Sequence, residues 1–188
     1  LLTVIGYGNH CTNIIKWQET DVLQRFVDLL NYKCKTNVYT GGYGGWLIVV
    51  NEVTSTTSTS IKVKYYHGAG GGGIVTKGAL NLTRALEMYE GFDVFAMGHI
   101  HENSCRNDVR DTIISSNNSG FKHRLKDIHL MITGTYKEEY EDGSKGWHVE
   151  RGAPPKPCGG RILIIDNKVL YNQKNVIAKS IDSIKFPI

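Results

Sequence analysis

A short apolar run that ends in a glycine and two histidines is the most constraining feature of this sequence. Residues Val94–Met97 have the composition of a buried strand, and the sequence Gly-His-Ile-His of residues 98–101 follows them directly. Neighbouring side chains of a strand point to opposite faces, but a glycine can turn the backbone and bring both imidazoles to one site. Because neutral imidazole is the commonest metal ligand in proteins, this segment predicts two adjacent metal positions. The alternative interpretation is two unrelated histidines in a loop.

Two other segments have the same arrangement. Gly-Asn-His, at residues 8–10, follows the apolar run of residues 1–5, and Tyr-His-Gly, at residues 66–68, follows the β-prone run Ile61–Tyr65. In each segment a glycine lies beside a histidine or an asparagine at the C-terminal end of the run. Binding sites of α/β sheets form where strand ends converge, so the three segments together predict one shared site.

In this order, Gly-Asn-His, His-Gly and Gly-His-x-His resemble the motifs of the calcineurin-like metallophosphoesterase superfamily, over roughly residues 1–166. The resemblance implies an α/β fold, a four-layer α-β-β-α sandwich of two packed sheets flanked by helices. It also implies a hydrolase that uses two divalent metal ions (Mn, Fe, Zn or Ni) and a metal-activated water to cleave a phosphomonoester or phosphodiester. Phage and repair members of the superfamily cut DNA, so nucleotides and nucleic acid are candidate substrates.

The resemblance also assigns roles to individual residues. The metal ligands that it implies are Asn9, His67 and His99 for one metal and His101 for the other. His10 would be catalytic and would act on the leaving-group oxygen, since the pKa of histidine lies close to neutrality. Cys11 follows it where the family most often has a carboxylate to orient the imidazole, and a thiol is a poor acceptor. A structural role for His10 is the alternative.

Two further residues are expected to contact the substrate. Tyr136 ends the segment of residues 133–136, which resembles the Gly-Ser/Thr-aromatic strand end of phage and bacterial members. His148 lies where related domains bring a loop near the mouth of the active site. Both assignments come from the resemblance.

Several other groups have two interpretations each. The glycine-rich segment of residues 68–73 is either a phosphate cradle or a flexible loop beside the site, and it lacks the Gly-Lys-Ser/Thr ending of a P-loop. Glu102 either holds a ligand imidazole or is an exposed loop carboxylate. His123 and His129 are expected to be surface or core groups.

The family's domain opens with an Asp-x-His strand and a Gly-Asp segment whose aspartate bridges the two metals, and neither precedes Gly8. We therefore expect residues 1–188 to be the C-terminal part of a single metallophosphoesterase domain, which alone would bind one metal or none and be inactive. A non-catalytic binding or scaffold module on the same fold is the alternative. A nucleotide-binding protein built on residues 70–73 is a third interpretation, which leaves the histidines unused.

Composition narrows the class of protein. At 188 residues the chain has the size of one domain and can bury a core. The net charge of +4 comes from scattered basic residues, which fits an anionic substrate without demanding nucleic acid. No apolar run reaches the roughly 20 residues that span a bilayer, so no membrane partner is expected. The four cysteines form no Cys-x-x-Cys, which favours free thiols in a cytoplasmic protein.

Local patterns predict the elements. Helices are expected from Thr20 or Asp21 to Tyr32 and from Thr76 to Tyr89. Residues 6–12 are expected to form a loop, and residues 54–60 an exposed loop or hairpin end. Strands are expected over residues 1–5, 46–50, 61–66, 94–97, 111–116 and 128–134, and a turn at residues 117–120 is expected to join the last two into a hairpin. A second hairpin is expected over residues 161–166 and 168–171, joined around Asp166-Asn167, and a last strand or tail over residues 172–188.

Overall fold

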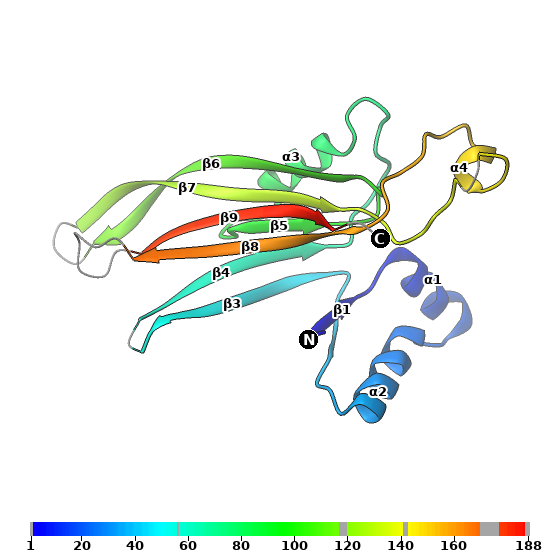
Figure 1. The fold of residues 1–188 in the computed structure, drawn as a ribbon, viewed down its shortest axis with the longest axis horizontal. Coiled ribbons are helices and arrows are strands. Elements are labelled where there is room, and N and C mark those ends of the chain that lie inside the picture. Colours follow the sequence, from blue (N-terminus) through cyan, green and yellow to red (C-terminus); the bar gives the residue numbers. More distant parts are fainter. Residues whose placement is uncertain (1, 56, 117–119, 141–142, 170–176, 187–188) are drawn as a thin grey trace.

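A computed structural model of the protein describes residues 2–55, 57–116, 120–140, 143–169 and 177–186 (Figure 1). Its strands, in chain order, are β1 (Val4–Gly6), β2 (Tyr39–Gly41), β3 (Gly44–Thr54), β4 (Thr57–Tyr66), β5 (Val94–Met97), β6 (Asn103–Ser116), β7 (Gly120–Thr133), β8 (Gly160–Val169) and β9 (Ile177–Phe186). Its helices are α1 (Asn9–Gln18), α2 (Val22–Cys34), α3 (Ala79–Met88) and α4 (Trp147–Glu150).

A five-stranded mixed sheet in the order β3-β4-β5-β7-β6 forms the centre of the molecule. Strands β4, β5 and β7 run parallel, with Val63, Val94 and His129 in register, whereas β3 and β6 are antiparallel to their neighbours. The parallel pair β1–β2 and the antiparallel pair β8–β9 form two smaller sheets. The predicted mixed α/β fold is therefore confirmed, and the carboxyl ends of three parallel strands meet at one edge of the sheet.

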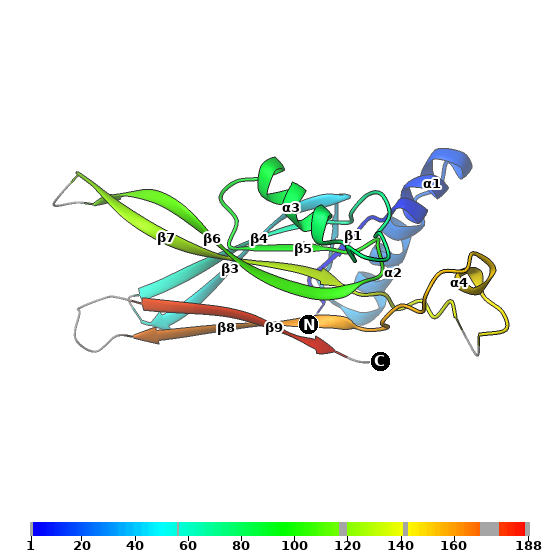
Figure 2. The same cartoon turned by 90° about the horizontal axis from the view of Figure 1, so that it is seen from above.

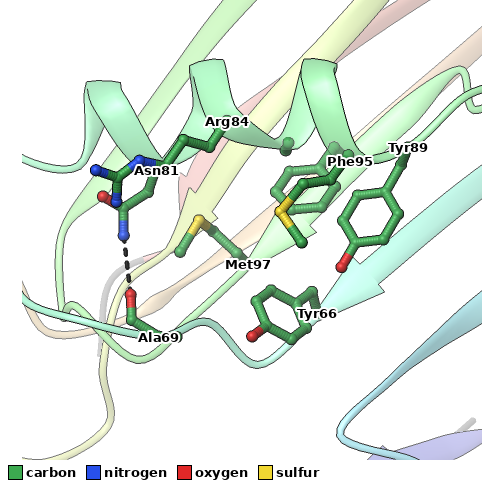
Figure 3. Close-up of a pocket in the computed structure, with 9 residues that line it drawn as sticks. Tyr66, Ala69, Asn81, Arg84, Tyr89, Phe95 and Met97 are labelled. Carbon is green, nitrogen blue, oxygen red and sulfur yellow. Dashed lines mark hydrogen bonds between the residues drawn. The ribbon is translucent and has the colours of Figure 1, made fainter.

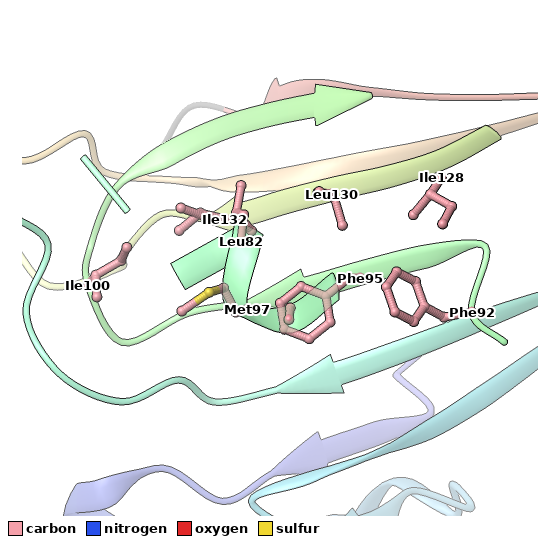
Figure 4. Close-up of a cluster of buried hydrophobic side chains, with 9 residues drawn as sticks. Leu82, Phe92, Phe95, Met97, Ile100, Ile128, Leu130 and Ile132 are labelled. Carbon is pink, nitrogen blue, oxygen red and sulfur yellow. The ribbon is translucent and has the colours of Figure 1, made fainter. Parts of the chain in front are cut away.

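Helix α3 covers one face of the five-stranded sheet and builds a core cluster there (Figure 4). Leu82, Ala85 and Leu86 follow the three- and four-residue spacing that places side chains on one face of a helix. They belong to the same cluster as Phe95 of β5 and Leu130 of β7, which are 1% and 0% exposed. This packing holds α3 over the middle strands of the sheet.

The pair β8–β9 covers the opposite face of the sheet, as Figure 2 shows. Leu163, Ile165 and Ile181 pack against a second cluster of buried side chains, Ile61, Val63, Val94 and Met131. The described part of the chain thus has a helix, a five-stranded sheet and a two-stranded sheet in successive layers. Helices α1 and α2 lie at one end, beside β1 (Figures 1 and 2).

A polar network crosses the interface between these two sheets. The buried ring of His129 in β7 forms hydrogen bonds with Asn107 Oδ1 at 2.6 Å and with Ser183 Oγ of β9 at 2.8 Å. The Arg161 guanidinium of β8 donates to Ser183 and to Asn103 Oδ1 of β6. These side chains satisfy one another inside the protein, where an unpaired polar group would be costly.

Several predicted elements are confirmed. Strand β5 has the predicted bounds. Helix α2 begins after Asp21, whose Oδ1 accepts a hydrogen bond from the Gln24 N–H at 2.9 Å, as expected of an N-cap. The strands predicted at residues 111–116 and 128–134 lie within the longer hairpin β6–β7. Most of the turn predicted between them lies outside the described residues.

The prediction of a loop over residues 6–12 is wrong for its second half. Helix α1 begins at Asn9 after Gly8 in an extended conformation, and the Thr12 N–H donates to the Gly8 carbonyl at 3.0 Å. None of the residues of α1 is buried, so the core of the protein does not require an apolar stripe in this helix. Asn9 and His10 therefore occupy the first turn of a helix.

The prediction of a hairpin around Asp166-Asn167 is also wrong. Both residues continue β8 and pair with Ser180 and Lys179 of β9. Asp and Asn favour turns, but the ladder with β9 and the packing of β8 on the central sheet outweigh that local preference. Of the two alternatives predicted for the end of the chain, a last strand or a tail, residues 177–186 form the strand, β9.

Candidate metal centre

The predicted site residues lie at the edge of the sheet where the parallel strands end. His67 follows β4, His99 and His101 follow β5, and Asn9 opens α1 shortly after β1. Figures 1 and 2 both place α1 and α4 at this same end of the molecule. Side chains that are far apart in the sequence therefore come within reach of one another.

Asn9, His67 and His99, here called the first cluster, bring three ligand atoms together. His67 Nε2 lies 3.0 Å from Asn9 Oδ1 and 3.3 Å from His99 Nδ1. Adjacent ligand atoms of one metal ion with bonds of about 2.1 Å lie about 3.0–3.4 Å apart, so the spacing fits a shared cation. A neutral His67 cannot donate to Asn9 and accept from His99 through the same nitrogen. A cation between the three atoms would satisfy all of them.

The backbone after β5 turns at the histidines and not at the glycine. His99 and His101 have φ values of 66° and 58°, in the left-handed region that residues other than glycine seldom adopt. Gly98 does not have a positive φ, so the turning role predicted for it is wrong. Ile100, between the histidines, is 6% exposed and belongs to the core cluster under α3. This anchoring holds a strained backbone of the kind that concentrates at functional sites.

Two glycines let the imidazoles approach the backbone closely. A Cβ atom at Gly8 would lie 2.7 Å from His67 Cε1, and one at Gly68 would lie 2.9 Å from the Cβ of His99. Any larger residue at either position would have to displace a histidine. Gly8 therefore makes room for the ring of His67, and Gly68 makes room for the base of His99 and also has a φ of 108°, which favours glycine.

Two histidines of this edge, His67 and His101, favour their neutral form. Burial lowers the pKa of His67, and the neighbouring imidazoles of His99, His10 and His101 lower it further. Burial likewise lowers the pKa of His101, although the Glu139 carboxylate partly opposes this effect. Neutral imidazole is the form that binds metal ions, so both rings are ready to act as ligands near pH 7.

His101, Glu139 and His148, here called the second cluster, hold their ligand atoms within 4.8 Å of one another. Glu139 and His148 are 6% and 4% exposed. His148 was predicted as a substrate contact, and Glu139 was not predicted at all. No strand end and no neighbouring glycine marks Glu139 in the sequence, so the fold alone brings it to the site.

Both clusters line one cleft of about 760 Å³. His10 lines it as well, and so do Gly70–Gly72 of the segment predicted as a phosphate cradle or flexible loop. Its basic lining residues are Lys137, Arg151 and Lys156. Tyr136 is 76% exposed and is not among the lining residues, so the structure does not bring it to the clusters.

Glu102 is buried, which makes the prediction of an exposed loop carboxylate wrong. It is 8% exposed, and its carboxylate accepts a hydrogen bond from the Lys156 ammonium. Its partner is a lysine rather than the imidazole that was the other expectation. The Glu102 carboxylate therefore neutralises the charge of Lys156, one of the basic residues that line the cleft.

The remaining histidines lie outside the cleft, as predicted. His129 ends an Asp-x-His tripeptide, residues 127–129, the pattern with which the resembling family opens its domain. Here the tripeptide lies in β7, and its imidazole is used in the network between the sheets. His123 Nε2 lies 2.6 Å from Asp111 Oδ1, and both side chains are exposed.

A second cavity, of about 220 Å³, lies between α3 and the ends of β4 and β5 (Figure 3). Tyr66, Phe95 and Met97 are among its lining residues. Asn81 adds a polar group but donates a hydrogen bond to the Ala69 carbonyl at 3.1 Å. The cavity contains none of the predicted site residues, and its lining offers no set of metal ligands.

No family model, no curated protein and no solved structure matches the chain. In the described ranges no helix is both long enough and apolar enough to cross a membrane. Function is therefore inferred from the geometry of the two clusters and from the motifs that carry them.

Proposed function

We propose that the protein is a metal-dependent phosphoesterase on a four-layer α-β-β-α sandwich of the calcineurin-like metallophosphoesterase type. The observation that carries the proposal is the meeting of Asn9, His67 and His99 at contact distances of 3.0 Å and 3.3 Å. These residues come from three segments whose order resembles the motif order of that superfamily. His101 lines the same cleft two residues after His99 and would belong to a second metal position.

The donor atoms suit divalent ions such as Mn, Fe, Zn or Ni, because they are imidazole nitrogens and an amide oxygen without thiolates. When bound, two such ions neutralise the charge of a phosphate ester and acidify a water molecule for in-line attack. The task of the first cluster is to present three lone pairs to one point. The left-handed backbone at His99 and the packing of His67 on Gly8 hold the two rings in this arrangement before any ligand binds.

His10 would protonate the leaving-group oxygen. It lines the cleft beside Asn9 in the first turn of α1 and is exposed to solvent, so it can exchange protons with water. Imidazole is suited to this role because its ordinary pKa is about 6.5. Cys11 is half-buried next to it and offers no carboxylate to orient the ring.

Arg151 would bind the phosphate group of the substrate. Lys137 and Lys156, which also line the cleft, are each paired with a glutamate. The Arg151 guanidinium lies 4.3 Å from the ring centre of Trp147, and within the described part of the chain no carboxylate forms an ion pair with it. An arginine held against an aromatic ring keeps its hydrogen-bond donors free for phosphate oxygens.

The test combines metal binding with turnover. Residues 1–188 and the product of the complete reading frame are stripped with chelator, loaded with Mn²⁺, and assayed on an aryl phosphodiester and an aryl phosphomonoester. Where the reading frame is longer than residues 1–188, its product is included because the resemblance implies further ligands from Asp-x-His and Gly-Asp motifs. His99→Ala is expected to lower the rate more than about 100-fold, since even loss of an outer group around a metal costs 10–100-fold. His123→Ala is the matched control, because the His123 ring is exposed and contacts Asp111 outside the cleft.

Equal rates for His99→Ala and the parent would overturn the proposal. Mn²⁺ binding without turnover of either ester by the longer product would favour the non-catalytic scaffold instead. Single-stranded and duplex DNA, added as further substrates, test the narrower assignment as a nuclease.

A further inference from the structure

Glu139 carries an unsatisfied atom in a place where proteins seldom leave one. Its side chain is 4% exposed, and its Oε2 atom is buried without a hydrogen-bond partner. A buried carboxylate oxygen without a partner costs free energy, and such an atom in a native structure calls for an explanation such as a bound ion.

Two imidazoles, of His101 and His148, offer ligand atoms close to this carboxylate. His148 Nε2 lies 3.5 Å from Glu139 Oε2, which is too long for a good hydrogen bond. The ring of His101 stands across from that of His148, with 6.3 Å between ring centres, and one ligand atom of each residue lies within 4.8 Å of the other two. We propose that His101, Glu139 and His148 form a binding site for one divalent transition-metal ion.

The donor set determines which ions fit. Two imidazole nitrogens and one carboxylate oxygen suit Zn²⁺, Fe²⁺ or Mn²⁺, and three protein ligands leave a position open for water or substrate. Ligand atoms around one tetrahedral zinc ion lie about 3.3–3.6 Å apart, because each bond is about 2.0–2.2 Å long. Small side-chain rotations would therefore bring the three atoms to bonding distance. The open position would face the cleft that all three residues line.

The surroundings already fix the carboxylate and one imidazole. The Lys137 ammonium pairs with Oε1 of Glu139, which leaves Oε2 for the metal. The His148 N–H donates to the Glu139 carbonyl at 3.2 Å, so the backbones of the two ligands are tied together. Outer partners of this kind orient metal ligands and raise affinity.

This site shares His101 with the proposed phosphoesterase centre, and its part in turnover rests on that proposed function. Metal binding itself does not. If both hold, Glu139 and His148 supply the second metal position with ligands from this chain, and His148 is a ligand rather than a substrate contact.

Co²⁺ absorption measures the site without reference to activity. The double variant Asn9→Ala/His67→Ala removes two ligands of the first cluster and leaves the second cluster unchanged. Chelator-stripped double variant is titrated with Co²⁺, and Zn²⁺ is then added as a competitor. We expect one Co²⁺ per chain, with the visible bands of a four- or five-coordinate ion, and displacement by Zn²⁺.

Glu139→Gln and His148→Gln are then introduced separately into this background. Each is expected to weaken Co²⁺ binding at least 100-fold, whereas His123→Gln should leave it unchanged. Far-UV circular dichroism reports whether each variant is folded, and either variant alone decides the result if the other does not fold. Absence of Co²⁺ binding in the background, or undiminished binding in the folded glutamine variants, would overturn the site. Intact Co²⁺ binding without ester turnover by the longer product would instead overturn only the proposed function.

Discussion

At the level of single residues, Glu139 shows how a carboxylate stays charged inside a protein. Burial by itself would raise its pKa, but the hydrogen bond and charge of Lys137, together with His148 and His101, outweigh burial and lower the pKa. Lys137 is 65% exposed, so its ammonium reaches the carboxylate from the solvent side. One oxygen of Glu139 is thereby satisfied and the other is left for a ligand.

Lys137→Met is expected to lower the thermal midpoint of the metal-free protein, because it leaves both oxygens of Glu139 without a partner. The expected loss in the free energy of unfolding is about 1–3 kcal/mol, the usual cost of an unsatisfied buried acceptor. Zn²⁺ should then raise the midpoint by less in the variant than in the parent, because Lys137 no longer orients the carboxylate that would bind the ion. Differential scanning fluorimetry with and without Zn²⁺ measures both effects. An unchanged midpoint in the metal-free variant would contradict the role given to Lys137.

His129 predicts a dependence of stability on pH. Burial lowers its pKa, the Asp182 carboxylate partly opposes this effect, and Arg161 lowers the pKa further by a smaller amount. The unfolded chain therefore takes up a proton at higher pH than the folded protein does, so stability falls as pH drops below the unfolded value of about 6.5. This contribution is fully present above that value and is lost as pH falls toward the folded pKa.

His129→Gln should reduce the difference between urea midpoints measured at pH 7.5 and pH 5.0. It will not abolish the difference, because the pKa values of His67 and His101 are lowered as well. His123→Gln, an exposed histidine, serves as the control and should keep the full difference. A variant at position 129 with the parent's full pH dependence would show that this ring does not contribute.

Among the elements, the short helix α4 depends on a glycine at its start. Gly146 has a φ of 110°, and a Cβ atom there would lie 2.3 Å from the Glu139 carbonyl oxygen. No side chain fits at that distance, so this glycine lets α4 dock on the backbone of Glu139 and places His148 beside the carboxylate.

Gly146→Ala is therefore expected to separate His148 from Glu139 and to weaken Co²⁺ binding in the Asn9→Ala/His67→Ala background by more than tenfold. Gly91→Ala is the matched control, since Gly91 also has a positive φ, of 81°, but a Cβ atom there meets nothing within 4 Å. The control should lose stability without losing Co²⁺ affinity. Equal affinities for the two variants would contradict the docking role of Gly146.

Elements with a strong local signal were predictable, and those decided by distant contacts were not. The apolar run of β5 and the cap of α2 identify themselves in the sequence. Helix α1 does not, because it buries none of its residues. Strand β8 passes through a turn-like Asp-Asn because β9 pairs with it, and the partners, Ser180 and Lys179, lie outside the short window in which local turn preference is read.

The same division holds for the candidate site. Asn9, His67 and His99 follow strand ends beside glycines, so their convergence could be expected from the sequence. Glu139 could not be found in this way, because it lies in a loop and reaches His148 through the geometry at Gly146. The left-handed backbone of the two histidines after β5 is likewise imposed by tertiary packing.

For the molecule as a whole, the central sheet is stabilised from both faces. Leu130→Ala removes a side chain that is 0% exposed in the cluster under α3 and is expected to cost about 2–5 kcal/mol in the free energy of unfolding. Ile48→Ala, at a position that is 64% exposed, should cost far less. Urea unfolding followed by fluorescence compares the two. Similar losses would mean that the sheet face under α3 is not the main core.

The network of His129, Asn107, Ser183, Arg161 and Asn103 has a consequence for how the two sheets are matched. Aliphatic side chains on facing sheets tolerate many sliding positions, since one branched side chain packs much like another. A displacement of β9 by two residues would keep the same face of the strand inward, but it would leave His129 Nε2 without the Ser183 hydroxyl as a donor and the Arg161 guanidinium without that hydroxyl as an acceptor. These directional hydrogen bonds thus select one alignment among several that have nearly equal apolar contact. Strand β9 therefore fixes the position of the two-stranded sheet on the five-stranded sheet.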